Sequence, residues 1–105
     1  MENSARGAAS ESRILNQLGE VKNTETVVGT EGKSIPDFQN STTVGEMKDA
    51  KTVSNTEQLR IQKEAAQDSG RQHELHTGVN THVTKPAAEG TNVIRHGDLG
   101  PKKPQ

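Results

Sequence analysis

The sequence contains no cysteine, tryptophan or tyrosine, and it has a single phenylalanine in 105 residues. Without cysteine, the chain can form neither a disulfide bond nor a thiolate zinc site. No apolar run approaches the roughly 20 residues that cross a bilayer, so we expect no membrane-spanning segment. The first residues also do not resemble a secretory signal. A folded core must therefore be built from aliphatic side chains and one aromatic ring.

Hydrophobic residues are scarce as well, at 27% of the chain, and the mean hydropathy is -0.92. Such a composition is also typical of disordered hydrophilic proteins, so that alternative stays open, as does a folded binding module without catalysis. The aliphatic residues are nevertheless spread along the chain in short groups, as a thin sheet with one or two helices requires. We therefore expect a single domain over 1–105, with a core over about 5–99 and a frayed tail at 100–105.

The formal net charge is -1, and the sequence has no long run of lysine or arginine. A protein that coats nucleic acid nonspecifically needs a broad basic surface to neutralise phosphates. The composition excludes that class. Any contact with nucleic acid must be local.

The first half of the chain alternates between helical and extended patterns. The spacing of apolar residues predicts a helix over 4–18, ended by Gly19, with Glu11 on the same stripe as the apolar side chains. Downstream, the pattern predicts a broken strand over 20–29, a loop over 29–34, and two strands over 35–39 and 43–48.

The second half begins with a helix over 55–69 that ends at Gly70. Residues 54–57 have the form of a capping box. Alternating residues over 75–83 predict two short strands, with Gly78 between them, and the chain from Pro86 is expected to be mostly loop. The order helix, three strands, helix, two strands indicates an α/β (α+β) fold.

The segment from Ile35 to Lys48 carries the candidate chemistry. If the two strands close through a two-residue loop at Ser41-Thr42, Asp37 lies opposite Glu46, and Phe38 lies opposite Gly45. Opposed like charges destabilise an antiparallel pair. A purely structural hairpin therefore has little reason to contain this pair of carboxylates.

Lys48 shares a strand face with Glu46, because side chains two residues apart point the same way. A hard cation such as Mg²⁺ or Mn²⁺ would accept oxygen ligands from both carboxylates of the Asp37–Glu46 pair. Lys48 would then orient a water molecule or neutralise negative charge on a reacting phosphate. The pattern thus indicates metal-dependent phosphodiester chemistry.

The chain resembles the PD-D/E-x-K nuclease superfamily in three segments: Ile35-Pro36-Asp37-Phe38, then Glu46-Met47-Lys48, then a capped helix carrying Gln58-Leu59-Arg60. More narrowly, it resembles the restriction-endonuclease-fold toxin domains at the C-termini of bacterial polymorphic and contact-dependent growth inhibition exoproteins. The resemblance covers roughly Glu11 to Val83. It implies a small restriction-endonuclease-like core, with a central mixed sheet flanked by helices.

The resemblance also implies the site residues. They are Glu11, Asp37, Glu46, Lys48 and Gln58, with Mg²⁺ or Mn²⁺ held by Asp37, Glu46 and Glu11. Each of these residues has a plainer explanation too: Glu11 as a first-turn carboxylate that favours the helix dipole, Glu46 and Lys48 as a solvated strand face, and Gln58 as an ordinary surface residue.

Several expectations about substrate and partners follow from the resemblance. The protein would be a toxin that cleaves nucleic acid in the cytoplasm of a target bacterium, delivered as the C-terminal part of a larger exoprotein. A small, nearly neutral chain suits a compact RNA recognised by shape, so transfer RNA is favoured and DNA stays the alternative. A cognate immunity protein would bind through an acidic patch opposite Lys48 and a flanking basic group: Arg60, Lys63, Arg71, His73 and His76.

Two further motifs do not hold. Gly32-Lys33-Ser34 lacks the upstream glycine of a phosphate-binding P-loop, because Val27 stands there, and a strand rather than a helix is expected after it. His73 and His76 are three residues apart in an expected strand, whereas a zincin helix places its histidines four apart. A zinc site at His82 or His96 is not favoured.

Overall fold

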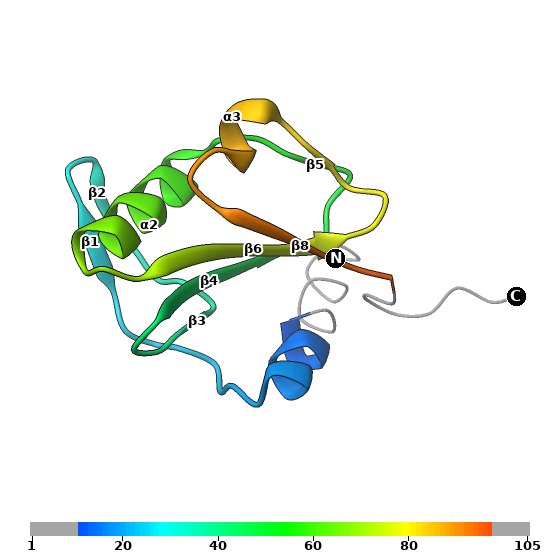
Figure 1. The fold of residues 1–105 in the computed structure, drawn as a ribbon, viewed down its shortest axis with the longest axis horizontal. Helices are drawn as coiled ribbons and strands as arrows, with labels where there is room; N and C mark the ends of the chain where they lie inside the picture. Colours follow the sequence, from blue (N-terminus) through cyan, green and yellow to red (C-terminus); the bar gives the residue numbers. More distant parts are fainter. Residues whose placement is uncertain (1–10, 98–105) are drawn as a thin grey trace, which may run out of the picture.

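A four-stranded mixed sheet forms the centre of the structure (Figure 1), a computed structural model that describes residues 11–97. Its strand order is β3 (Phe38–Gln39), β4 (Thr43–Lys48), β6 (Gln72–Gly78) and β8 (Asn92–His96). β3 and β4 are antiparallel, whereas β4, β6 and β8 run parallel. Parallel neighbours need long crossovers, and here each crossover carries a helix. The α/β fold with a central mixed sheet flanked by helices is confirmed.

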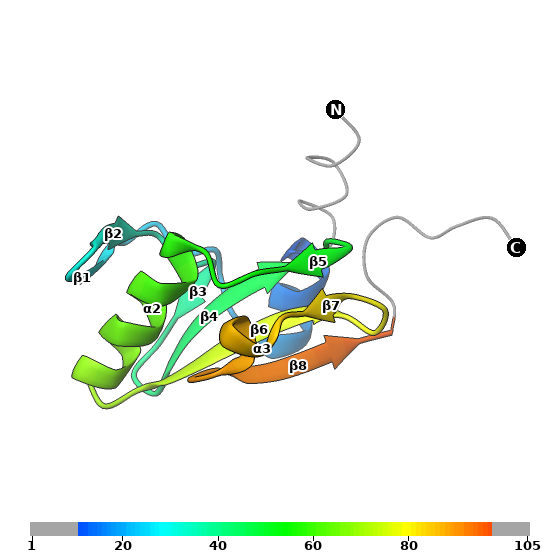
Figure 2. The same ribbon diagram turned by 90° about the horizontal axis from the view of Figure 1, so that it is seen from above.

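Helices cover both faces of this sheet (Figures 1 and 2). α2 (Glu57–Asp68) and the one-turn α3 (Lys85–Ala88) lie on one face, and the N-terminal helix, described over 11–18, lies on the other. Strand alternation gives each face its own apolar cluster. The α2 side contains Val53, Leu59, Leu75 and Ala87, and the N-terminal side contains Ile14, Leu15, Phe38 and Met47.

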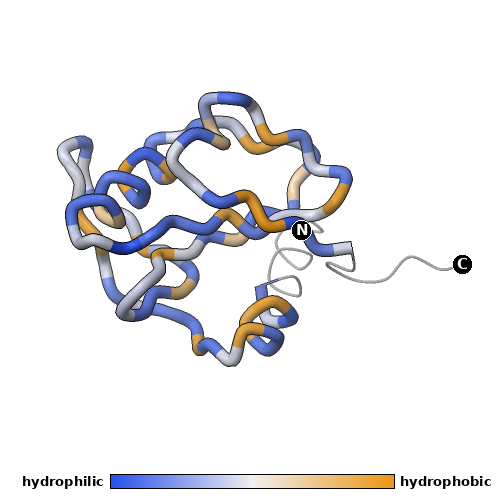
Figure 3. The backbone as a smooth tube through the Cα atoms, in the orientation of Figure 1, coloured by the Kyte–Doolittle hydropathy of each residue, from blue (hydrophilic) through white to orange (hydrophobic). Residues whose placement is uncertain are grey.

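Two smaller strand pairs complete the fold. The hairpin of β1 (Val27–Gly29) and β2 (Gly32–Ser34) packs on the outer side of α2, where Val27 contacts Ile61 and Ala65. β5 (Thr52–Val53) pairs in parallel with β7 (His82–Val83). Figure 3 shows that the hydrophobic stretches of the backbone are short, and the cluster of Ile14, Leu15, Phe38 and Met47 joins residues far apart in sequence. The core is therefore assembled from long-range contacts. Among the described residues, no helix is long and apolar enough to cross a membrane.

The expected hairpin register is confirmed. Phe38 pairs with Gly45 and Gln39 with Val44, and Asn40 N–H donates to the Thr43 carbonyl at 2.9 Å, which leaves Ser41-Thr42 as the loop. The expected helix ends are confirmed too. Gly19 and Gly70 both have positive φ angles, near 71° and 72°, a backbone region in which glycine carries no steric penalty.

The expected capping box at 54–57 is wrong. The helix is capped two residues later by Thr56, whose hydroxyl accepts a hydrogen bond from the Leu59 N–H at 3.3 Å. The chain turns tightly just before this cap, because Thr56 N–H donates to the Ser54 carbonyl at 2.9 Å. That turn takes Ser54 out of the capping position.

Three expected loops or strands also differ. Residues 29–34 form the β1–β2 hairpin rather than a loop, and residues 20–26 are irregular, so the expected strand over 20–29 is reduced to β1. The chain after Pro86 completes α3 and then supplies β8, an edge strand of the main sheet. These short elements depend on packing against α2 and β6, which local propensity does not report. The expected helix start at Ser4 and the tail at 100–105 lie outside the described residues.

The pairing of Phe38 with Gly45 generates a stability prediction. A Cβ atom added at Gly45 would overlap the Phe38 ring, which is only 2% exposed and sits within the Ile14–Met47 cluster. We expect Gly45→Ala to destabilise the fold by about 1–3 kcal/mol, as overpacking in a core does. Urea unfolding measures this, with Gly97→Ala as the control because no atom lies near a Cβ there. An equal, negligible effect of both substitutions would contradict the prediction.

Candidate active site

Asp37 is held at the sheet edge by the way in which the β3–β4 ladder ends. Hydrogen-bonded pairs alternate in an antiparallel ladder, so the pair after Phe38–Gly45 would be Pro36–Met47. In place of the Pro36 carbonyl, the Asp37 carboxylate accepts the Met47 N–H, with Oδ2 at 2.8 Å. The Pro36 carbonyl accepts instead from Asn23 Nδ2 at 2.9 Å, and proline has no N–H with which to continue the ladder beyond this point. The Asp37 carboxylate therefore takes over a backbone bond of the sheet.

Glu46 and Lys48 extend from the same face of β4 toward α2. Glu46 is 3% exposed, and its Oε2 lies 3.2 Å from the ammonium of Lys48. The Lys48 Nζ also lies 3.5 Å from Gln58 Oε1, at the first turn of α2. The lysine remains partly exposed, at 38% of its side chain. It can therefore reach a solvent-borne anion while it balances the buried carboxylate.

A buried amide fixes the second oxygen of Glu46. Gln62 is completely buried, and its Nε2 donates to Glu46 Oε1 at 3.0 Å and to Ser34 Oγ at 3.1 Å. Its carbonyl oxygen lies 2.9 Å from Nε2 of His73, whose Nδ1 lies 2.7 Å from the Thr91 hydroxyl. Burial, with Lys63 and His76 nearby, lowers the pKa of His73 to about 4. A neutral His73 thus orients the amide that holds Glu46.

Glu11 approaches Asp37 from the N-terminal helix, with Lys22 between the two side chains. The Lys22 ammonium forms an ion pair with Glu11 and lies 3.6 Å from Asp37 Oδ1. Burial, together with the Glu46 and Glu11 carboxylates, raises the pKa of Asp37 to about 7, against the smaller opposing effects of the Met47 N–H and Lys22. Burial is the largest of these effects, and repulsion from Glu46 is the next.

The side chains of the carboxylate cluster, Glu11, Asp37 and Glu46, are the type of ligand that a hard divalent cation prefers, because their oxygen atoms are of the kind that Mg²⁺ or Mn²⁺ binds. The pKa of Asp37 is raised first by burial and then by repulsion from Glu46 and Glu11, and a divalent charge would relieve that second part. The Lys22 ammonium already holds a cation's position between two of these carboxylates. Within residues 11–97, no three His, Asp or Glu side chains are arranged to share one ion as the side chains stand.

The structure brings all five expected site residues to one region. Asp37, Glu46 and Lys48 meet at the β3–β4 edge, Gln58 joins through Lys48, and Glu11 joins through Lys22. The expected face shared by Glu46 and Lys48 is confirmed by their contact.

Sequence reasoning missed two residues of this region. Gln62 lies one helical turn beyond Gln58, on the buried side of α2 with Ile61 and Ala65. A polar residue among buried apolar ones was the sequence signal that could have indicated its role. Lys22 lies in the irregular segment over 20–26, where no periodicity indicates what a side chain contacts.

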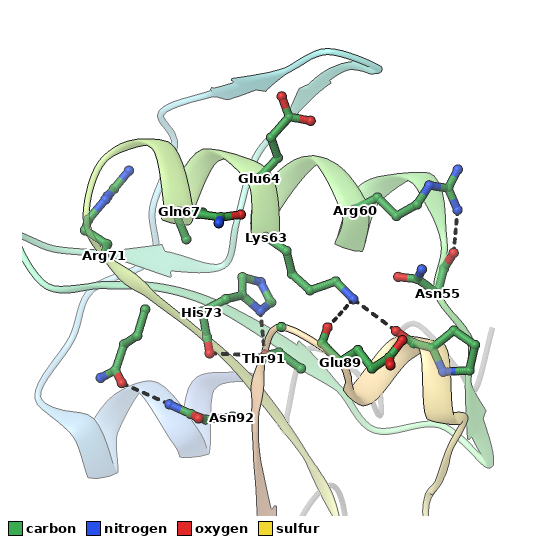
Figure 4. Close-up of a pocket in the computed structure, with 14 residues that line it drawn as sticks. Asn55, Arg60, Lys63, Glu64, Gln67, Arg71, His73, Glu89, Thr91 and Asn92 are labelled. Carbon is green, nitrogen blue, oxygen red and sulfur yellow. Dashed lines mark hydrogen bonds between the residues drawn. The ribbon is translucent and has the colours of Figure 1, made fainter.

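A separate cavity of about 800 Å³ lies between α2, the start of β6 and the segment joining α3 to β8 (Figure 4). None of the expected catalytic residues lines it. Its basic side chains are engaged within the protein: Lys63 Nζ donates to the Glu89 carbonyl at 2.8 Å, and Arg71 donates to Gln39 Oε1 at 2.8 Å. This cavity is distinct from the carboxylate cluster.

The basic group expected to face an acidic partner needs correction. His73 and His76 are 2% and 1% exposed, because both point from β6 into the protein rather than outward. Arg60 is paired with Glu31 through two bonds of 2.8 Å. Of the residues expected to face the partner, Lys48 is partly exposed and lies at the carboxylate cluster.

One comparison with known proteins gives a match. The model of a family described as "Restriction endonuclease fold toxin 7" matches residues 7–87 of the chain. No curated protein and no solved structure matches. The matched range contains every residue of the carboxylate cluster and the whole of β1 to β7.

The buried His73 generates a pH prediction. Its pKa in the folded protein is about 4, below the 6.5 of a free histidine, so the unfolded chain takes up a proton first as the pH falls. The folded state should therefore lose stability between about pH 6.5 and 4, by roughly 3 kcal/mol from this group. We expect His73→Gln to be less stable at pH 7.5 but to lose less on acidification. Urea unfolding at several pH values measures this, with exposed His82→Gln as the control; identical pH slopes for the wild type and His73→Gln would contradict it.

Proposed function

The chain belongs to the restriction endonuclease fold toxin 7 family, and from this premise we propose that Asp37, Glu46 and Lys48 form the catalytic core of a metal-dependent endonuclease. Membership makes the protein a nuclease toxin that acts on nucleic acid, and nucleases of this fold generally use divalent metals. The observation that carries the assignment is the Asp37–Glu46 carboxylate pair at one sheet edge, with Lys48 beside it.

The division of roles follows from burial and contacts. A bound Mg²⁺ or Mn²⁺ would polarise the phosphate and activate a water molecule. Asp37, Glu46 and Glu11 are the proposed ligands. Gln62 restricts the Glu46 carboxylate to one orientation, because its amide donates to Oε1 at 3.0 Å.

Lys48 is the proposed contact to the reacting phosphate. Its ammonium is partly exposed and lies 3.2 Å from Glu46 Oε2. A cation at that position stabilises the negative charge that develops on the phosphate oxygens. Gln58 Oε1, 3.5 Å from the same Nζ, limits the directions in which the lysine side chain can extend.

We propose RNA as the substrate, with transfer RNA as the leading candidate. A protein that follows a long duplex needs many free lysine and arginine side chains, but the chain carries a formal net charge of -1. Arg60, in the first turn of α2, and Arg71, just before β6, bind groups of the protein itself. A compact RNA recognised by its shape and by a few phosphates suits such a surface better.

Substitution of the core residues tests the site. We expect Asp37→Asn, Glu46→Gln and Lys48→Met each to lower cleavage by at least roughly 100-fold, since the first two weaken the proposed metal ligands and the third removes the cation that contacts the reacting phosphate. Glu11→Gln should also lower it strongly. The folds should remain intact, and Asp37→Asn should be slightly more stable because it relieves carboxylate repulsion. Initial rates and thermal melting measure both effects. Glu25→Gln, an exposed carboxylate, is the matched control, and full activity in Asp37→Asn would reject this site.

A substrate comparison tests both the metal and the nucleic acid. We expect the purified full chain to cleave transfer RNA with Mg²⁺ or Mn²⁺ present, and to stop when EDTA is in excess, because the oxygen donors favour hard ions. The same preparation should leave plasmid DNA intact, with Asp37→Asn as the control for contaminating nuclease. Nicked plasmid beside intact transfer RNA would replace the RNase proposal with a DNase, and undiminished cleavage in EDTA would reject the metal.

Delivery and inhibition complete the proposal. We propose that the chain acts in the target-cell cytoplasm as the C-terminal part of a larger exoprotein, and that the producing cell makes a dedicated immunity protein. Lys48, the partly exposed cation at the cluster, would attract an acidic patch on that partner. Adding the product of the neighbouring gene should stop cleavage and raise the melting temperature. The free energy of unfolding should rise by about 4 kcal/mol when the partner is present at roughly a thousand times its Kd. Unchanged cleavage and melting would remove this partner.

A further inference from the structure

Lys22 contacts both Glu11 and Asp37. It pairs with Glu11 directly and lies 3.6 Å from Asp37 Oδ1. We propose that Lys22 is the resident cation of the site: its ammonium occupies the position between these two carboxylates, and a divalent ion must displace it in order to bind. This inference rests on the proposed metal-dependent function.

The backbone around Lys22 is held in place by its neighbour Asn23. The Asn23 N–H donates to the Asp37 carbonyl at 2.9 Å, and Asn23 Nδ2 donates to the Pro36 carbonyl at 2.9 Å. The same amide also donates to the Glu25 carbonyl at 2.7 Å. The irregular segment is thus tied alongside Asp37, on the side of the ladder that Pro36 leaves open. Lys22 is placed at the carboxylates by backbone bonds, not by a freely moving side chain alone.

The charge balance of the cluster explains why such a cation is useful. Glu46 has Lys48 beside it at 3.2 Å, so the second pair, Glu11 and Asp37, depends on Lys22. Without a positive charge there, two partly buried carboxylates would face each other with no compensation. Lys22 therefore allows the site to fold before metal arrives.

The same contacts make Lys22 replaceable. Its side chain is 62% exposed, so the ammonium is already largely hydrated and can move away from the carboxylates into water at little cost. Exposed ion pairs contribute little, so displacement should weaken metal binding only roughly three- to fivefold. A compact monovalent cation on a flexible stem can give way to a divalent ion, which attracts both carboxylates more strongly. Lys22 thus tunes metal affinity without blocking it.

Metal affinity measures this role without reference to cleavage. Isothermal titration calorimetry with Mn²⁺ is applied to the full-length wild type, to Lys22→Gln, and to Lys22→Arg, which keeps the charge. Lys33→Gln is the matched control, because it removes the same charge from an exposed position on β2. We expect roughly three- to fivefold tighter binding in Lys22→Gln alone, with Lys22→Arg and Lys33→Gln close to the wild type. Thermal melting checks that each variant is folded.

Displacement itself can be observed by NMR. After reductive methylation with ¹³C-formaldehyde, the dimethylammonium signal of Lys22, assigned by its absence in Lys22→Arg, should move on titration with Mg²⁺ while that of Lys33 stays. Its midpoint should coincide with the Kd for Mg²⁺ from a calorimetric titration of the same methylated protein. Equal Mn²⁺ affinity in the wild type and Lys22→Gln, or Mg²⁺ binding with an unmoved Lys22 signal, would overturn the role of Lys22 alone. No binding of either ion by any variant would instead overturn the proposed metal-dependent function.

Discussion

The hydrogen bond from the Met47 N–H to the Asp37 carboxylate is the contact on which the rest of the site depends. It exists because the β3–β4 ladder stops before Pro36, whose carbonyl accepts from Asn23 Nδ2 instead, so the Met47 N–H of β4 is left for a side chain. A carboxylate bound there sits at the sheet edge, next to Glu46. Two like charges are held together by the register of a hairpin, and the free energy of that arrangement must come from the sheet and helices around it.

The surrounding structure meets that cost with few apolar residues. Two separate apolar clusters, one on each face of the sheet, take the place of a large core. A series of hydrogen bonds between buried polar side chains leads from Glu46 into the protein. Gln62 and His73 are both buried and fully paired with Glu46 and Thr91. Buried polar groups that are all satisfied restrict a structure to one arrangement, which suits a protein with so little hydrophobic surface to bury.

Cations complete the account of the carboxylate cluster. Lys48 balances Glu46 from the α2 side, and Lys22 balances Glu11 and Asp37 from the N-terminal side. Burial and the neighbouring Glu46 and Glu11 carboxylates nevertheless raise the pKa of Asp37 to about 7. If the cluster is the metal site that we propose, the resident ammonium groups would offset part of its negative charge before metal binds, and the exposed side chain of Lys22 would let that ammonium leave.

The sequence by itself determined the parts of this protein that local rules govern. Helix periodicity, the stops at Gly19 and Gly70, and the strand alternation that puts Glu46 beside Lys48 all act within a few residues. The two-residue loop that sets Phe38 opposite Gly45 is equally local. Only the tertiary structure decided the rest. β8 is an edge strand because β6 lies beside it, and Lys22 meets Asp37 because Asn23 bonds to a distant hairpin. Such contacts join residues that no local period relates, so their energies appear only once the chain has folded.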